Sequence, residues 1–315
     1  MQLEPIGENV VSQSKHGPSN AFTIGFMICL CCGCALILAV LSSSLKELQE
    51  TGEMLERNKQ MLMSAQVYNT SGYFQIKAED GTFVPAKHIG NGMLEPATEN
   101  DLATTEDVFA VFERRIKSYL IKENGEFTTF KEEGIDESSY TREHEGTGYA
   151  NLPLKLIYAV FPNEDKEFKD LNKAESFVFP VSGFGLWAAI YGYLAVANDG
   201  YHVVGISWYK HGETPGLGAN IAAPWWQEQF EGKVIFQKDK AGNVDVANAP
   251  VGITVMRGKV SETLGDSPKA HSAVDGMSGA TLTGNGVTKA YKETLAPYRP
   301  FLLRVNEHFK ETNAS

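Results

Sequence analysis

The sequence predicts an α+β protein with a single N-terminal transmembrane helix followed by a soluble mixed α/β domain. Three observations predict this class: an uncharged apolar run near the N-terminus, a group of strand-like runs after residue 152, and a helical pattern near the C-terminus. The 315 residues are 43% hydrophobic and 21% charged, which suffices for a sizeable core and excludes wholesale disorder. A net charge of −11 argues against a broad nucleic-acid-binding surface, so no nucleic-acid partner is expected.

The first element is a membrane span at residues 21–42, preceded by an N-terminal tail at residues 1–20. No charged side chain lies between Lys15 and Lys46, and the run AFTIGFMICLCCGCALILAVL contains a single hydroxyl group. A helix of this length measures roughly 31 Å and matches a hydrocarbon core of roughly 30 Å. We therefore expect an anchor that contacts membrane lipid through residues 21–42.

A cleaved signal peptide is the alternative, because Ser42, Ser43 and Ser44 offer small residues for cleavage directly after the run. The run is too long for the apolar part of a signal peptide. The tail before it also carries Glu4 and Glu8 against a single lysine. Both features favour an anchor that stays on the protein.

All four cysteines of the chain lie inside the predicted span: Cys29, Cys31, Cys32 and Cys34. Their clustering is compatible with a metal or iron–sulfur site. On one helix, however, the four side chains point in different directions, and no other ligand residues accompany them. We interpret them as small apolar residues that pack in lipid or against another helix, and we expect no metal site. The rest of the chain has no cysteine, which excludes disulfides and catalytic thiols there.

A helical stalk is predicted at residues 43–66, because leucines recur on one helical stripe and charged residues fill the other faces. The stripe consists of Leu41, Leu45, Leu48, Leu55 and Leu62. The soluble domain then occupies residues 67–315. In its first part, residues 67–150, the pattern does not decide between helix and strand.

The strand-like runs begin near residue 152 and read LPLKLIYAVFP, ESFVFPVSG, LWAAIYGYLAV and HVVGISWYK, with turn residues between them. A helical face follows at residues 287–295, formed by Val287, Ala290, Tyr291, Thr294 and Leu295. Strands that are grouped together with few helices between them favour an α+β core at about residues 152–296.

The segment GFGLWA at residues 183–188 formally matches the dinucleotide-binding pattern G-x-G-x-x-A. Pro180 interrupts the run before it, and the residues after it are not helix formers. Asp199 is too close in sequence to serve as the acid that binds a ribose. We interpret the segment as a glycine turn between two strands.

The segment HGETPGLG at residues 211–218 combines proline and glycines with a carboxylate and a hydroxyl group. His211 and Glu213 lack the fixed helical spacing of a metal pair. Two interpretations stay open from the residues alone. The loop brings main chain close to a flat ligand, or it is a turn with a structural role only.

The segment VDGMSGATLTGNGV at residues 274–287 is rich in small and hydroxyl residues and precedes the late helical face. Gly279 would let the backbone approach a phosphate closely, and exposed N–H groups at a helix start attract anions. Alternatively, Thr283 or Asn285 would be the N-cap of the late helix. The residues alone leave both a phosphate site and a simple helix cap open.

The stretch DGMSGAT at residues 275–281 resembles the flavinylation motif D-x-x-[ST]-G-A-T of the FMN-binding domain family. HGETPGLG, and GLW followed by Tyr191 and Gly192, are also similar to that family. With the anchor and the stalk, the whole chain resembles the flavin-carrying subunits of sodium-translocating NADH:quinone oxidoreductases. The similarity is close at residues 177–287 and looser at residues 67–150.

The resemblance implies that FMN is attached covalently, as a phosphoester, to the hydroxyl of Thr281. It also implies cofactor contacts in two loops, from Asp275, Ser278, Gly279, Ala280, Leu282, Thr283, Glu213, Thr214, Gly216 and Leu217. Four aromatic residues are further candidate neighbours of the flavin ring: Trp187, Tyr191, Trp208 and Tyr209. No residue of the chain is expected to be catalytic. In the family a separate flavin transferase forms the bond from FAD with a divalent metal, and Asp275 would help it recognise the site.

The function that the resemblance implies is electron relay within a membrane complex that oxidises NADH, reduces ubiquinone and transports sodium ions. The partners would be the other membrane and soluble subunits of this translocase, and the chain alone holds no complete active site. The corresponding flavin subunit of the related ferredoxin:NAD oxidoreductase is an alternative. A membrane-anchored, non-redox ligand-binding domain is an alternative from a different class.

The orientation in the membrane is poorly determined by charge. Lys46, Arg57 and Lys59 follow the span and favour a body on the cytoplasmic side, but glutamates are interspersed with them. The resemblance implies a bacterial cytoplasmic (inner) membrane protein whose flavin domain lies on the outer, periplasmic side. We follow the resemblance as the stronger indication.

Overall fold

The computed structural model describes residues 19–78, 81–163 and 170–314. The chain divides into two compact units, Met1–Glu53 and Met54–Ser315. In the described residues, the first unit consists of helix alone and the second holds all the strands.

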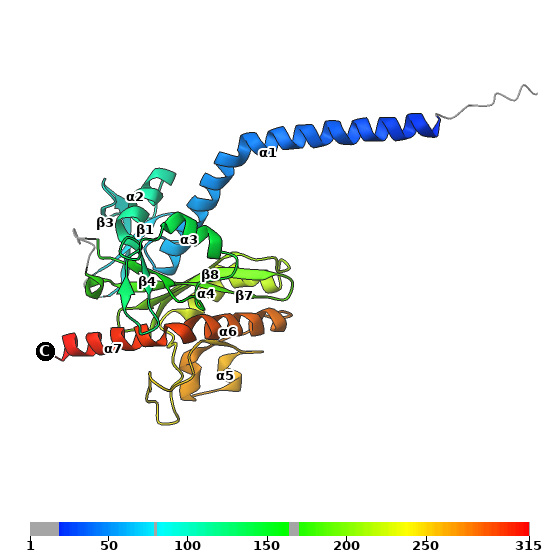
Figure 1. Ribbon diagram of the computed structural model, residues 1–315. Helices are drawn as coiled ribbons and strands as arrows, with labels where there is room; N and C mark the ends of the chain where they lie inside the picture. Colours follow the sequence, from blue (N-terminus) through cyan, green and yellow to red (C-terminus); the bar gives the residue numbers. More distant parts are fainter. Residues whose placement is uncertain (1–18, 79–80, 164–169, 315) are drawn as a thin grey trace, which may run out of the picture. The chain divides into compact units, whose positions relative to one another are not determined.

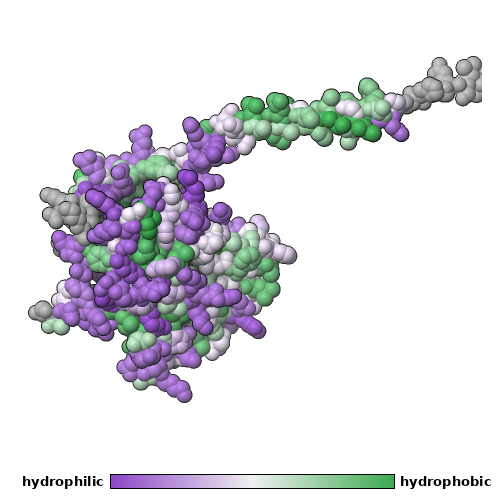
Figure 2. All heavy atoms as spheres, viewed as in Figure 1, coloured by the Kyte–Doolittle hydropathy of each residue, from purple (hydrophilic) through white to green (hydrophobic). Residues whose placement is uncertain are grey.

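Helix α1 (Asn20–Ser64) covers both the predicted span and the predicted stalk without a break. Its N-terminal part, in the first unit, is long and apolar enough to cross a membrane, judged by length and composition. Figure 2 shows the apolar residues along this helix. The four cysteines lie here as free, exposed thiols.

The C-terminal end of α1 belongs to the second unit, where Met61 and Leu62 are buried. The helix ends in a Schellman motif, in which the N–H of Val67 donates to the carbonyl of Leu62 and the N–H of Gln66 donates to that of Met63. Gln66 has a φ of +54°, a left-handed conformation that glycine usually adopts at this position.

We expect Gln66→Gly to be more stable than Gln66→Ala by about 1 kcal/mol, because only the alanine variant keeps a Cβ in the left-handed conformation. Both variants lose the same side-chain contacts, so the comparison isolates the backbone. Urea unfolding of the two full-length variants measures the difference, and equal stabilities would contradict it.

A three-stranded antiparallel sheet and one helix follow α1: β1 (Phe74–Lys77), β2 (Phe83–His88), β3 (Leu94–Pro96) and α2 (Thr105–Arg115). Helix α2 begins with a capping box, since the Thr104 hydroxyl accepts from the Asp107 N–H and the Asp107 carboxylate accepts from the Thr104 N–H. Val108 and Val111 of α2 are buried against the large sheet of the domain. The undecided region 67–150 thus contains both strands and helices.

The large sheet has six antiparallel strands in the order β5-β4-β6-β7-β8-β9. Its strands, with the α-helix that lies between β5 and β6, are β4 (Ile116–Ile121), β5 (Phe127–Thr128), α3 (Glu137–His144), β6 (Lys155–Val160), β7 (Ser176–Phe184), β8 (Ala189–Ala197) and β9 (Val203–Lys210). The short 3-10 helix η1 (Leu171–Lys173) precedes β7. The sheet therefore begins at Ile116, well before the residue-152 boundary expected for the core.

Pro180 does not interrupt its strand, and the expectation that it would is wrong. β7 pairs with β6 only at residues 176–178, whereas it pairs with β8 along its whole length. Pro180 therefore lies beyond the residues at which β7 pairs with β6, at a position that needs no N–H for the ladder on that side. Residues 185–188 form the turn between β7 and β8, in keeping with the predicted glycine turn.

The two faces of the large sheet are covered by different elements, because alternate residues of each strand point to opposite sides. One face buries Phe177 and Phe179 of β7 against the C-terminal helices, and the Phe179 ring lies 5.0 Å from the Tyr298 ring. The other face buries Val178 against the end of α1 and against α2.

The C-terminal part of the chain forms short elements that lead into two long helices. They are η2 (Gly218–Ala222), α4 (Pro224–Gln227), η3 (Glu228–Phe230), β10 (Thr254–Val255), α5 (Val260–Thr263), η4 (Pro268–Ser272), β11 (Ala273–Val274), α6 (Thr281–Leu295), η5 (Ala296–Tyr298) and α7 (Arg299–Asn313). Strands β10 and β11 pair in parallel. Figure 1 shows α6 and α7 following one another along the sheet, and α6 packs on β7.

Candidate functional site

Three segments meet at the start of α6: the β7–β8 turn at residues 185–188, the loop at residues 211–218, and the segment at residues 275–280 that leads into the helix. Glu213 joins them. Its Oε1 accepts from the N–H groups of Leu186 at 2.9 Å and Trp187 at 3.0 Å, and its Oε2 accepts from the Thr283 hydroxyl at 2.5 Å. The turn, the loop and the first turn of α6 are therefore tied to one carboxylate.

The Glu213 carboxylate is buried, with 6% of the residue exposed. Burial raises the pKa of the carboxyl, but hydrogen bonds from the Thr283 hydroxyl and from the N–H groups of Trp187 and Leu186 outweigh this effect, so the pKa lies below its usual value. The group is thus an ionised acceptor that receives three hydrogen bonds. The carboxylate bonds to the segments around it, and the predicted contact between Glu213 and a cofactor stays a prediction.

Three glycines allow the β7–β8 turn, the loop at residues 211–218 and helix α6 to approach one another closely. A Cβ at Gly185 would lie 2.4 Å from Glu213 Oε1, and one at Gly218 would lie 2.6 Å from Glu213 Oε2. A Cβ at Gly286 of α6 would lie 2.1 Å from the carbonyl oxygen of Phe184. Glycine at these positions is required by space rather than by backbone conformation.

The segment before α6 is held by Asp275. Its Oδ1 accepts from the N–H of Val260 at 2.7 Å, its carbonyl accepts from Trp226 Nε1 at 3.0 Å, and its N–H donates to Gln229 Oε1 at 2.9 Å. The next residue, Gly276, lies so close to the Met256 carbonyl that a Cβ would be 2.0 Å from its oxygen. Asp275 is half-buried, and these three hydrogen bonds hold the segment in place.

Thr281 is exposed and is the first residue of α6. The N-cap is Ala280, and no side chain of the described residues caps the helix. The expectation that Thr283 or Asn285 serves as N-cap is therefore wrong, because both lie inside the helix and the Thr283 hydroxyl is used by Glu213. The N–H groups of the first turn have no partner within the helix, which makes this end favourable for an anion.

The remaining predicted residues of the attachment segment divide by exposure. Ser278, Gly279 and Leu282 are exposed, whereas Ala280 is buried and Thr283 is only 1% exposed. Gly279 adopts a φ of +72°, so the turn before Thr281 requires glycine for its conformation as well.

Large apolar side chains are exposed at the end of β7 and in the turn after it, in the loop at residues 211–218, and in the first turn of α6. We call this set the apolar collar; it consists of Phe184, Leu186, Trp187, Leu217 and Leu282. Trp187 is 68% exposed, and its indole Nε1 donates to the Thr214 hydroxyl at 3.2 Å, which connects the turn with the loop. Gly216 and Thr214 are exposed in the same loop. Exposed apolar residues gathered on converging loops are typical of a binding surface.

Of the four predicted aromatic neighbours, only Trp187 lies on the collar. Trp208 is buried in the core, where its ring lies 5.7 Å from that of Tyr291. Tyr209 stacks on Tyr193 at 5.1 Å, within the cluster on the other face of the sheet. Tyr191 donates its hydroxyl to the carbonyl of Gly146. The alternation of strand residues, which sends neighbours to opposite faces, separates them.

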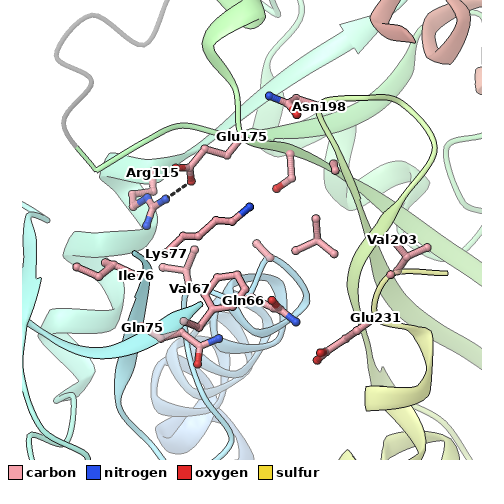
Figure 3. Close-up of a pocket in the computed structure, with 16 residues that line it drawn as sticks. Gln66, Val67, Gln75, Ile76, Lys77, Arg115, Glu175, Asn198, Val203 and Glu231 are labelled. Carbon is pink, nitrogen blue, oxygen red and sulfur yellow. Dashed lines mark hydrogen bonds and ion pairs between the residues drawn. The ribbon is translucent and has the colours of Figure 1, made fainter. Parts of the chain in front are cut away.

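A pocket of about 480 Å³ lies at the opposite end of β7, where the strand begins. Figure 3 shows Lys77 directed into it and the ion pair between Arg115 and Glu175 on its wall, at an N–O distance of 2.5 Å. Neither Thr281 nor any residue of the collar lines it. The nine residues of β7 place it roughly 26 Å from the collar end of the strand. The two sites are thus separate.

In the described part of the chain, no group of three or more His, Cys, Asp or Glu residues is placed to hold a metal ion. The Nδ1 atom of His211 has no hydrogen-bond partner among the described residues. The chemical groups that the described residues place at this site are the Thr281 hydroxyl at a helix start, the buried Glu213 carboxylate and the apolar collar.

Comparison with known proteins identifies the class of this site. Residues 185–296 match the FMN-binding domain, a segment that runs from the β7–β8 turn to the end of α6. The chain is 38% identical to the C subunit of the Na(+)-translocating NADH-quinone reductase of Chlamydia caviae, over 90% of this chain and 91% of the relative. It is also 38% identical to the corresponding protein of Chlamydia muridarum, over 93% and 95%. The chain belongs to the family of C subunits of the Na(+)-translocating NADH-quinone reductases, and the predicted resemblance is confirmed.

Solved structures support the fold. The C subunit from Parabacteroides distasonis superimposes with a TM-score of 0.51 at 22% identity, over 82% of this chain and 96% of that one. NqrC of Shewanella oneidensis gives a TM-score of 0.50 at 22% identity, over 82% and 99%. The mixed α/β domain is therefore shared with these structures. Together with the N-terminal apolar helix α1 of this chain, it confirms the predicted fold class. The helix and the family together indicate a membrane-associated subunit of an oxidoreductase complex that binds FMN.

Proposed function

We propose that this chain carries FMN covalently on Thr281 and relays electrons between other subunits of a sodium-translocating NADH:quinone oxidoreductase. The observation that carries the proposal is the exposed Thr281 hydroxyl, which stands in the motif DGMSGAT at the uncapped start of α6. A hydroxyl in the helix interior or in the core would be out of reach of a modifying enzyme.

The start of α6 suits the phosphate of FMN. Anions are stabilised at a helix N-terminus by its unpaired N–H groups and by the helix dipole, worth typically about 0.3–1 kcal/mol at exposed sites. No described side chain competes for these groups, and Gly279 removes the bulk of a side chain beside them. Ser278 adds a hydroxyl group next to the same turn.

We propose that the apolar collar holds the flavin ring and that Thr214, Gly216 and Leu217 line the ring from the loop at residues 211–218. The collar offers apolar surface on three segments next to the attachment residue. In this proposal four residues lie behind the flavin surface, because Ala280, Thr283 and Glu213 are buried and Asp275 is half-buried. They hold the loops rather than the cofactor.

Attachment needs no base on this chain. In our proposal a flavin transferase uses FAD and a divalent metal. The Thr281 oxygen forms a bond to the FMN phosphorus and its proton passes to the transferase, while the pyrophosphate bond of FAD breaks and AMP leaves. FMN then supplies one- or two-electron chemistry, while the protein sets its position and surroundings. The donor and the acceptor of the electrons lie on other subunits.

The anchor at residues 21–42 has no ionisable side chain other than its thiols and cannot conduct sodium ions by itself. From the family resemblance we further propose that the flavin domain lies on the periplasmic side of the bacterial inner membrane. The sodium path belongs to partner subunits.

The test is the intact mass of the full-length protein, produced with and without a flavin transferase and then denatured to remove loose ligands. We expect a gain equal to FMN minus water only in the presence of the transferase, and peptide mapping should place it on Thr281. An unmodified chain after co-production would overturn covalent attachment and the electron-relay role with it.

A further inference from the structure

Glu213 is well placed to act on the flavin site without touching the cofactor. It accepts hydrogen bonds from the β7–β8 turn and from α6, it is itself part of the loop at residues 211–218, and it is buried beneath the collar. A buried carboxylate with these bonds formed holds its neighbours at fixed distances, because any separation leaves an unpaired charge.

The attachment segment is held by a different set of contacts. Asp275 bonds to Val260, Trp226 and Gln229, none of which contacts Glu213 through a hydrogen bond in the described residues. Among the described residues, the hydrogen bond of Glu213 nearest in sequence to the attachment residue is the one from Thr283, in the first turn of α6. The hydrogen bonds of Asp275 therefore still hold the segment before Thr281 when the Glu213 carboxylate is removed.

We infer that Glu213 is a positioning residue that orders the apolar collar, and that attachment of FMN and seating of its ring are separable. This inference rests on the proposed function. Without the carboxylate, the N–H groups of Leu186 and Trp187 lose their acceptor. The hydrogen bond between the turn and the loop is then the exposed one from Trp187 Nε1 to the Thr214 hydroxyl, so the turn is held less firmly against the loop. The flavin stays tethered at Thr281 while its ring loses a fixed surface.

Three variants of the full chain, each produced with the transferase, test the inference. Glu213→Ala removes the acceptor of the three hydrogen bonds from Leu186, Trp187 and Thr283. Glu213→Gln keeps hydrogen bonds to the same three groups, because the amide oxygen accepts from the two N–H groups and the amide nitrogen donates to the Thr283 oxygen. Asn306→Ala is the matched control: it removes a buried bond from Asn306 Nδ2 to the Asp199 carbonyl, beyond the far end of β8.

Intact mass measures covalent FMN per chain, and flavin fluorescence anisotropy and visible circular dichroism measure the order of the ring. For Glu213→Ala we expect FMN per chain within about twofold of the parent protein, with the flavin dichroism reduced by about half or more. Glu213→Gln should restore most of the dichroism. Asn306→Ala should lose stability without a change in the flavin signals, which separates a local role from general destabilisation.

Two results would overturn the inference while the proposed function stands. One is a Glu213→Ala protein that carries FMN and keeps the full dichroism and anisotropy. The other is a Glu213→Ala protein that remains folded but carries no FMN while the parent protein does. A parent protein without covalent FMN would instead overturn the proposed function itself, so the two failures are distinguishable.

Discussion

Thr281→Val is expected to abolish covalent FMN and to leave the fold intact. Valine has nearly the shape of threonine and the same branching at Cβ, but it lacks the oxygen that the phosphoester requires. Thr281 is exposed, and the side chain is no part of a cap, so we expect its replacement to change the free energy of unfolding by less than about 0.5 kcal/mol. Intact mass after co-production with a flavin transferase measures the loss.

Thr281→Ser is the matched variant, since it keeps the hydroxyl and removes only the methyl group. We expect partial flavinylation, because the nucleophilic oxygen is retained but its rotamer is less restricted. FMN on Thr281→Val at the level of the parent protein would show that another residue is the attachment point. Thr283 is no ready substitute, because its hydroxyl is buried and bonded to Glu213.

The candidate site can be located from the sequence because it consists of contiguous motifs. Thr281 lies in DGMSGAT and Thr214 in HGETPGLG, and both segments lie at the same end of the domain. The strand-like runs also predict β6 to β9, since each shows an apolar pattern long enough to detect. The position of Glu213 cannot be found in this way, because its partners lie 26 or more residues away in the chain.

The region at residues 67–150 resists prediction for a different reason. β1 has four residues and β3 has three, too few for a period-2 pattern to stand out. Helix α2 carries a readable signal, however. The spacing of Thr104 and Asp107 is that of a capping box, directly before the buried Val108 and Val111.

Helix α6 begins at Thr281, six residues before the helical pattern becomes recognisable at Val287, and the reason is propensity. Gly284 and Gly286 are poor helix formers, so they hide the first turns of the helix in the sequence. In the structure both glycines are helical, and at Gly286 the close packing of α6 against the end of β7 requires a residue without a side chain. Packing overrides the local preference here.

This packing leads to the second large effect: Gly286→Ala is expected to destabilise the protein by about 2–3 kcal/mol. Alanine would gain about 1 kcal/mol of helix propensity over glycine. Its Cβ, however, would lie 2.1 Å from the carbonyl oxygen of Phe184, a backbone atom that cannot rotate away. Overpacking of this kind typically costs about 1–3 kcal/mol, and more where backbone must move.

Two glycines in helices provide matched controls for Gly286→Ala, measured by urea unfolding of the full chain. At Gly284 the nearest obstacle is a side-chain atom, Val255 Cγ1 at 3.0 Å, so Gly284→Ala should stay within about 1 kcal/mol of the parent protein. A Cβ at Gly52 would meet no described atom within 4 Å beyond the neighbouring backbone of its own helix, and Gly52→Ala should not destabilise at all. Because displacement of the β7–β8 turn would also pull Leu186 and Trp187 from Glu213, Gly286→Ala should disorder the flavin ring as Glu213→Ala does. A Gly286→Ala protein as stable as Gly284→Ala would show that α6 and the turn separate easily, and the close packing assigned to this end of the helix would be wrong.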